Sequence, residues 1–157
     1  MRNITYAAAE KQEEETVSVL LMAVLEYAHD TILYRGLDEV KVAMKTVRYS
    51  PLNKAQTIIA SLVMGCKHTK DINEVLPREV AAANYLGMNQ FPEQSQINRY
   101  LTRFSEENVS QLRQAHNQVF MEQSQARRVV GRVVVDIDQC GLVANGQTYE
   151  FARKGYF

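Results

Sequence analysis

The sequence is poor in the residues that mark several common classes of protein. Its 157 residues include only 7 glycines, 3 prolines and 2 cysteines. So little glycine and proline argues against long disordered linkers. The two cysteines, Cys66 and Cys140, lie far apart and form no CxxC or Cys/His spacing. They therefore predict buried free thiols rather than a zinc site.

A long apolar run is also absent. The longest stretch, residues 17–28, is interrupted by Ser18 and Glu26, which makes it too short and too polar to span a bilayer. It follows three consecutive glutamates at 13–15, whereas a secretory signal opens with positive charge. The sequence therefore predicts a cytoplasmic protein without a membrane contact.

The formal net charge is zero, yet the charges are distributed unevenly. Residues 1–40 hold 3 Lys or Arg and 8 Asp or Glu, a balance of −5, whereas residues 41–157 hold 15 and 10, a balance of +5. A positive excess in the later part of the chain permits contact with nucleic acid. An excess of this size is also ordinary for a small soluble domain, so the charge alone does not require such a contact.

The first 125 residues have the periodicity of helices. Apolar residues three or four positions apart, together with capping residues, predict helices over about 14–34, 37–47, 53–64, from 71, 78–86, 96–104 and 106–123. Gly65 is the expected C-cap of the third helix, and Ser95 and Ser105 are the expected N-caps of the last two. We therefore expect a helical domain over residues 1–126.

The pattern changes to that of a β-sheet near residue 127. Residues 129–138 form a nearly continuous β-branched run that is typical of a buried strand. The pair Asn145 and Gly146 predicts a hairpin, because both central residues of a type I′ turn need positive φ. One strand and one hairpin cannot bury a core alone. Residues 127–157 are therefore expected to begin a second domain that this sequence does not complete.

The predicted strand ends in Asp136 and Asp138, which share one face because side chains alternate along a strand. A carboxylate at the end of an apolar strand needs compensation, and Mg²⁺ is a suitable partner. In two-metal sites such carboxylates hold the ions that activate the attacking oxygen and stabilise the leaving one. The alternative is a solvated strand end at which the two aspartates cap a turn.

A second candidate site lies in the helices expected at 78–86 and 96–104. A helix of small residues followed by a helix that begins at serine is similar to a helix-turn-helix, whose second helix enters the major groove of DNA. The side chains that could reach bases or phosphates are Gln94, Gln96, Asn98, Arg99 and Arg103. The connection is longer than the usual turn, so two bundle helices with a polar outer face are the alternative.

A small basic cluster marks the expected domain junction. The cluster consists of Arg127, Arg128 and Arg132. It either contacts a backbone phosphate or belongs to a solvated linker. The three histidines share no spacing that would indicate a metal or catalytic site.

Three stretches of the chain, taken in order, carry a resemblance to a known family. They are residues 49–51 with 58–66 and 71–76; Leu86 and Gly87 with 92–101; and VVVDID at 133–138, followed by GQ at 146–147, YE at 149–150 and KGYF at 154–157. Behind a helical region, this order resembles the insertion-sequence transposases of the DDE group, whose catalytic domain has the RNase H-like fold. The resemblance covers roughly residues 49–157.

The resemblance implies a fold and a catalytic residue. The implied fold is a mainly α N-terminal helical domain followed by the first strand and hairpin of a truncated α/β RNase H-like domain. Asp138 would be the first catalytic aspartate and a metal ligand. Asp136 is the alternative, because Cys140 stands where the family usually has Thr or Ser. The family's second Asp and its Glu are absent, so these residues alone are not expected to cut DNA.

The implied parent protein is a transposase that binds the terminal inverted repeats of its element. It would catalyse Mg²⁺-dependent strand cleavage and transfer into target DNA, as a homo-oligomer when complete. The expected DNA contacts are Gln96, Asn98, Arg99, Arg103, Arg127 and Arg128. Two alternatives come from other classes: a non-enzymatic DNA-binding protein that uses the helix-turn-helix-like pair, and a purely structural helical bundle.

Overall fold

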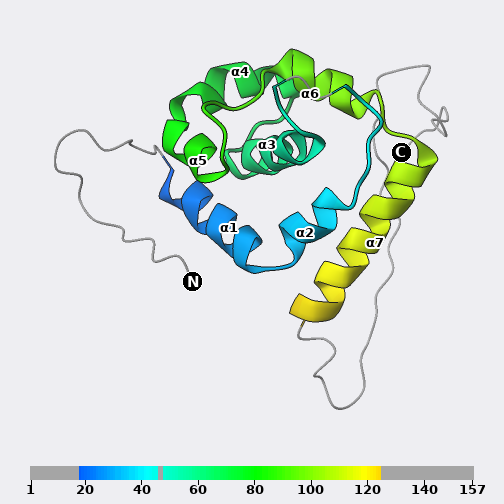
Figure 1. Ribbon diagram of the computed structural model, residues 1–157. Coiled ribbons are helices and arrows are strands. Elements are labelled where there is room, and N and C mark those ends of the chain that lie inside the picture. The colour runs from blue at the N-terminus through cyan, green and yellow to red at the C-terminus, as the bar shows by residue number, and fades with distance from the viewer. Residues whose placement is uncertain (1–17, 46–47, 125–157) are drawn as a thin grey trace, which may run out of the picture. The chain divides into compact units, whose positions relative to one another are not determined.

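The computed structural model describes residues 18–45 and 48–124, and it is mainly helical over this part of the chain, with no strand (Figure 1). The α-helices are α1 (Val19–Asp30), α2 (Leu33–Asp38), α3 (Pro51–Val63), α4 (Ile72–Val75), α5 (Val80–Tyr85), α6 (Gln94–Leu101) and α7 (Glu106–Gln123). Two 3₁₀ turns, η1 (Thr69–Asp71) and η2 (Leu76–Arg78), flank α4. The predicted helical character of the first domain is confirmed for these residues, whereas the predicted strand and hairpin lie outside them.

The helix α3 occupies the centre of the domain, and the other short helices surround it (Figure 1). It packs against α1, α2 and α6. The core between them contains Leu21 and Leu25 of α1, both without exposed surface, and Ile97 of α6. No helix in the described ranges is long and apolar enough to cross a membrane.

Local capping signals account for several helix boundaries. Ser50 caps α3, because its Oγ accepts from the backbone N–H of Asn53 at 3.0 Å and the Asn53 side chain accepts from the Ser50 N–H at 3.0 Å. Ser105 and Asn108 form the same reciprocal pair at the start of α7, so the predicted Ser105 cap is confirmed. Gly65, just after α3, has a φ of +76°, the left-handed conformation that glycine adopts at helix C-termini.

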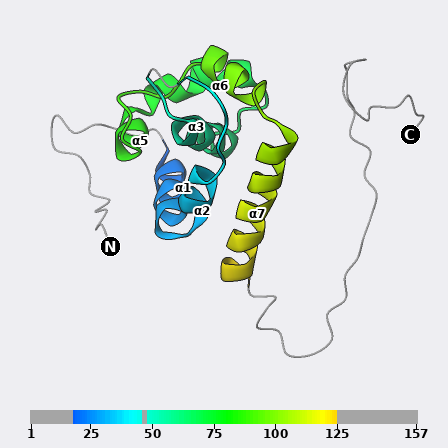
Figure 2. The same cartoon turned by 45° about the vertical axis from the view of Figure 1, so that its right-hand side comes forward.

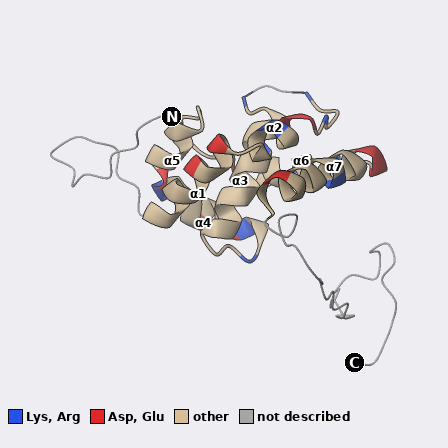
Figure 3. Cartoon of the chain, turned by 90° about the horizontal axis from the view of Figure 1, so that it is seen from below, with Lys and Arg blue, Asp and Glu red and all other residues tan. Residues whose placement is uncertain are grey.

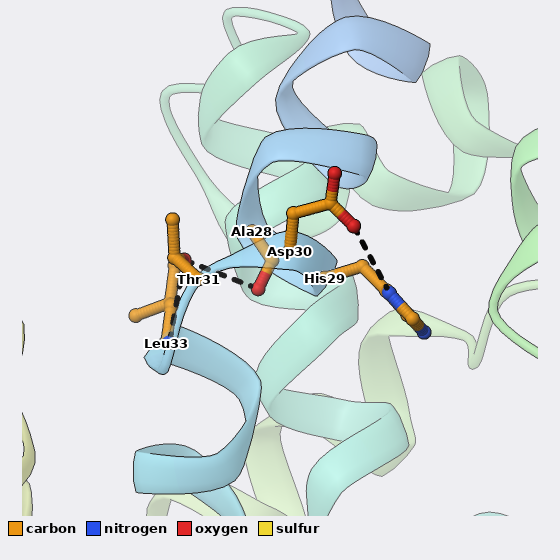
Figure 4. A network of polar contacts seen from close by, with 5 residues as sticks. All are labelled: Ala28, His29, Asp30, Thr31 and Leu33. Carbon is orange, nitrogen blue, oxygen red and sulfur yellow. Dashed lines mark hydrogen bonds and ion pairs between the residues drawn. The ribbon is translucent and has the colours of Figure 1, made fainter. Parts of the chain in front are cut away.

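The predicted helix over 14–34 is interrupted at Thr31. The backbone N–H of Thr31 donates to Tyr27 at 3.0 Å, but its own backbone is extended. Its hydroxyl donates to the Ala28 carbonyl at 3.3 Å and accepts from the Leu33 N–H at 3.4 Å, as Figure 4 shows. The side chain thereby replaces helical hydrogen bonds at the junction, and the chain begins a separate helix, α2.

The predicted helix over 37–47 is wrong over residues 39–45, and residues 46–47 lie outside the described residues. Residues 40–45 form no helix, and Val40 and Val42, two positions apart, are both buried. The backbone of this segment is bound instead by side chains of α7: the Lys41 N–H donates to Gln111 Oε1 at 2.9 Å, and Asn108 Nδ2 donates to the Lys41 carbonyl at 3.0 Å. We call residues 40–45 the connecting segment.

The predicted N-cap of α6 is also wrong. The helix begins at Gln94, one residue before Ser95, and Glu93 occupies the N-cap position in extended conformation. The Gln94 N–H donates to Asn73 Oδ1 at 2.8 Å, so a residue far away in sequence satisfies this helix end. The helix then ends at Leu101, before the predicted boundary at 104.

The long helix α7 lies along α2 (Figures 1 and 2). The two backbones come close at Gly36, where an added Cβ would lie 3.1 Å from Cβ of Ala115. A separation this short leaves no room for a larger side chain. The small residues at this crossing therefore hold α7 near the connecting segment, to which it supplies Asn108 and Gln111.

Candidate nucleic-acid interface

A groove of about 890 Å³ lies between the connecting segment, the start of α3 and α6. The residues that line it are Ala43, Met44, Lys45, Arg48, Tyr49, Lys54, Gln96, Arg99, Thr102 and Arg103. Half of these ten residues are Lys or Arg and none is Asp or Glu. We call this cavity the basic groove. Its charge is that of a site for anions.

One wall of the basic groove is the polar side of α6. Ile97 and Tyr100 are buried on the opposite side of this helix, which fixes its orientation on the domain. Gln96 and Arg99, three positions apart, share a face of α6, and Arg103, two residues beyond the end of the helix, lines the groove with them. Arg99 of α6 and Arg103 of the turn after it thus place two guanidinium groups on one wall.

The opposite wall is formed by the connecting segment and the residues just before α3. The short run between α2 and α3 carries basic positions, drawn blue in Figure 3. Lys45 and Arg48 are exposed on this wall, whereas the neighbouring Tyr49 is only 4% exposed. The Arg48 guanidinium lies 5.1 Å from the centre of the Tyr49 ring, a cation–π arrangement that restrains the cation.

Lys54 is the buried cation among the five Lys and Arg residues of the groove. It is 3% exposed, and its Nζ donates to the Tyr49 carbonyl at 2.8 Å and approaches Met44 Sδ at 3.5 Å. Burial lowers the pKa of this amine from the ordinary value for lysine, because removal from water penalises the charged form. An anion in the groove would restore the favourable interaction that the ammonium loses on burial.

The structure brings together three of the side chains predicted to contact DNA. Gln96, Arg99 and Arg103 all line the basic groove, whereas Asn98 is exposed on α6 and does not line it. The remaining predicted site residues, Arg127, Arg128, Asp136 and Asp138, lie outside the described residues.

Sequence reasoning missed the cations of the opposite wall, namely Lys45, Arg48 and Lys54. A signal was present, because the sequence contains no Asp or Glu between Glu39 and Asp71. A segment of this length that contains several lysines and arginines but no acidic residue indicates a positively charged surface. The segment does not itself show which of its cations face α6.

The packing of α5 and α6 can be compared with that of the two helices in a helix-turn-helix motif. α5 packs mainly against α1, whereas α6 packs mainly against α3 and η1. The basic side of α6 also faces a concave groove. A concave, cationic surface suits a phosphate backbone that enters it, whereas a recognition helix acts by entering the DNA groove itself.

The described residues contain no cluster of three or more His, Cys, Asp or Glu side chains that could hold a metal ion. His29 lies 3.8 Å from Asp30 (Figure 4), and His68 lies 3.8 Å from Asp71, and both histidines are largely exposed. Among the described residues, the basic groove is the candidate site for an anion.

Comparisons with known proteins found no match: no family model, no curated protein and no solved structure is similar to this chain.

Proposed function

We propose that the basic groove binds the phosphate backbone of DNA, and that the chain is the N-terminal, DNA-contacting part of a DDE transposase. One observation supports the first statement above all others. Five cations from three separate segments converge on one groove that no carboxylate of the described residues lines. Lys and Arg side chains that neutralise phosphates supply most of the affinity of proteins for DNA that does not depend on sequence.

The groove favours phosphates over bases. The tyrosine ring in its wall is buried beneath Arg48, so it offers no free face on which a base could stack. The polar groups that remain are guanidinium and ammonium groups, an amide and a hydroxyl. These groups bind phosphate oxygens well, and the guanidinium groups of Arg99 and Arg103 can each do so with two parallel hydrogen bonds.

The catalytic part of the proposal is supported by the motif VVVDID at residues 133–138 and its position behind a helical domain. In the full-length transposase, Asp138 would bind one Mg²⁺ ion together with carboxylates from the rest of the catalytic domain. The ions would supply the charge stabilisation for in-line attack on the phosphodiester, first by water and then by a 3′-hydroxyl.

DNA binding is tested by fluorescence anisotropy with a labelled duplex at two salt concentrations. We expect the 157-residue chain to bind with a Kd on the order of 10⁻⁴ to 10⁻⁶ M near physiological salt, and to bind more tightly at lower salt. The double variant Arg99→Ala, Arg103→Ala should bind more weakly at both concentrations. Arg113→Ala is the matched control, because Arg113 is exposed on α7 and does not line the groove. Equal binding by the double variant and the wild type would exclude the groove as the interface.

Catalysis is tested in the full-length protein with an element-end substrate and Mg²⁺. Asp138→Asn should abolish strand cleavage while DNA binding persists, and Asp136→Asn should leave cleavage intact. Cleavage that survives Asp138→Asn would refute the assigned role. A full-length protein that binds DNA but shows no cleavage would favour the non-enzymatic DNA-binding alternative.

A further inference from the structure

The position of Lys54 distinguishes it from the other cations of the basic groove. Lys45, Arg48, Arg99 and Arg103 are exposed, whereas Lys54 is nine-tenths buried and lies on α3, in the core of the domain. Exposed cations attract a polyanion diffusely and adapt to it. A buried ammonium has a fixed position, because its carbonyl and thioether neighbours hold Nζ in place.

The partners of the Lys54 ammonium are neutral. They are the Tyr49 carbonyl and the Met44 sulfur, and no carboxylate of the described residues lies within 4.0 Å of Nζ. An ammonium carries three donors, so one remains after these two contacts. A buried charge without a counter-ion is unfavourable. The geometry therefore leaves the Lys54 ammonium with one unused donor and no negative charge beside it.

We infer that the Lys54 end of the basic groove is a discrete site for one phosphate group, held by the Lys54 ammonium and completed by the guanidinium groups that line the same groove. This inference rests on the proposed function, because the phosphate is taken to belong to the bound DNA. A phosphate suits the site better than a carboxylate does. Its oxygens can accept from several cations at once, and more than one guanidinium lies on the walls.

If a phosphate binds beside Lys54, the protein should take up a proton when it binds DNA at alkaline pH. Burial lowers the pKa of Lys54 in the free protein, and a phosphate beside it would raise that pKa again. The other titratable groups near the site are Lys45 and Tyr49 on its own side and Tyr100 from α6. The guanidinium groups near it are those of Arg48, Arg99 and Arg103. Affinity should therefore fall as the pH rises through the lowered pKa of Lys54.

The phosphate could be an internal diester of the strand or a 5′-terminal monoester. Three probes separate these sources: inorganic phosphate, a duplex with 5′-phosphates and the same duplex with 5′-hydroxyls. Equal affinity for the two duplexes assigns an internal diester. Tighter binding of the phosphorylated duplex, together with competition by inorganic phosphate, assigns the terminal group.

The test compares Lys54→Met with Lys70→Met, an exposed lysine outside the groove. Methionine keeps an unbranched apolar stem, one heavy atom shorter than lysine, and removes the charge. We expect Lys54→Met to lose roughly tenfold or more in DNA affinity, the value of one charge-assisted hydrogen bond, and Lys70→Met to change it by about twofold at most. Circular dichroism confirms that each variant is folded.

The wild-type pH profile supplies a second readout that needs no substitution. As the pH rises toward the ordinary lysine pKa of about 10.4, wild-type affinity should fall more steeply than that of Lys54→Met. A folded Lys54→Met protein with wild-type affinity and the wild-type pH profile would overturn the inference and leave the proposed function intact. Failure of the wild-type chain to bind DNA would instead refute the proposed function.

Discussion

The dependence of DNA affinity on salt concentration gives a quantitative test of the basic groove. Each phosphate neutralised by a lysine or arginine releases counterions, so log Kobs falls with log[salt] with a slope of about −0.9 per contact on duplex DNA. The groove contains Lys45, Arg48, Lys54, Arg99 and Arg103. If all of them contact phosphates, the wild-type slope is about −4.5. Removal of Arg99 and Arg103 should reduce its magnitude by about 1.8, to about −2.7.

These slopes correspond to large differences in affinity. Raising the salt from 50 mM to 200 mM should weaken wild-type binding by about 500-fold and binding by the Arg99→Ala, Arg103→Ala variant by only about 40-fold. Fluorescence anisotropy at four or more salt concentrations measures both slopes. Arg35→Ala, a substitution in α2 away from the groove, should leave the slope at its wild-type value. A double variant with an unchanged slope would refute the assignment of these two arginines to phosphate contacts.

Three further predictions concern the scaffold that holds the groove. Leu25 has no exposed surface, so Leu25→Ala should lower the free energy of unfolding by about 2–5 kcal/mol. The control Leu20→Ala, at a position that is 64% exposed, should change this free energy by about 0.5 kcal/mol at most. Urea denaturation measures both values. Gly36→Val should lower the free energy of unfolding by about 1–3 kcal/mol and increase amide hydrogen exchange in α7, because the added side chain would meet Ala115. Unchanged exchange in α7 would contradict the close approach of α2 and α7 at this point. The backbone N–H groups of His68 and then Lys67 lower the pKa of Asp71, so its stabilising effect is present above its ordinary pKa near 3.9 and is lost as the pH falls through the lowered value. Thermal denaturation should show a smaller loss of stability between about pH 5 and about pH 2 for Asp71→Asn than for the wild type.

Short-range signals predicted the parts of the fold that depend on neighbouring residues. The start of α7 at Ser105 and the end of α3 before Gly65 follow from capping rules that act over three or four positions. The same rules failed at Ser95, because Asn73, far away in sequence, caps α6. They also failed for residues 40–45, whose backbone is bound by side chains of α7. Contacts between distant residues cannot be read from periodicity.

The candidate site, like the fold, was predictable from the sequence only where it depends on residues close together in the chain. The helix predicted over 96–104 contains Gln96, Arg99 and Arg103, and this spacing alone places them on one face. The observed helix ends at Leu101, and Arg103 lies in the turn that follows, where its N–H donates to the Tyr100 carbonyl at 3.1 Å. Lys45 and Lys54 reach the groove only because the connecting segment departs from helical geometry and α3 packs against α6. The sequence has no acidic residue between Glu39 and Asp71, but which lysines and arginines of this stretch face α6 depends on the fold. The predicted role of Asp138 stays a prediction from its motif.

The central claim is that DNA binds in the basic groove, and chemical-shift mapping by NMR tests it most directly. A ¹⁵N-labelled sample of the 157-residue chain is titrated with unlabelled duplex at low salt. We expect the largest amide shifts at Lys45, Arg48, Lys54 and residues 96–103, with the outer face of α1 little changed. Shifts concentrated on α1 or on the far end of α7, with the groove residues unmoved, would contradict the claim.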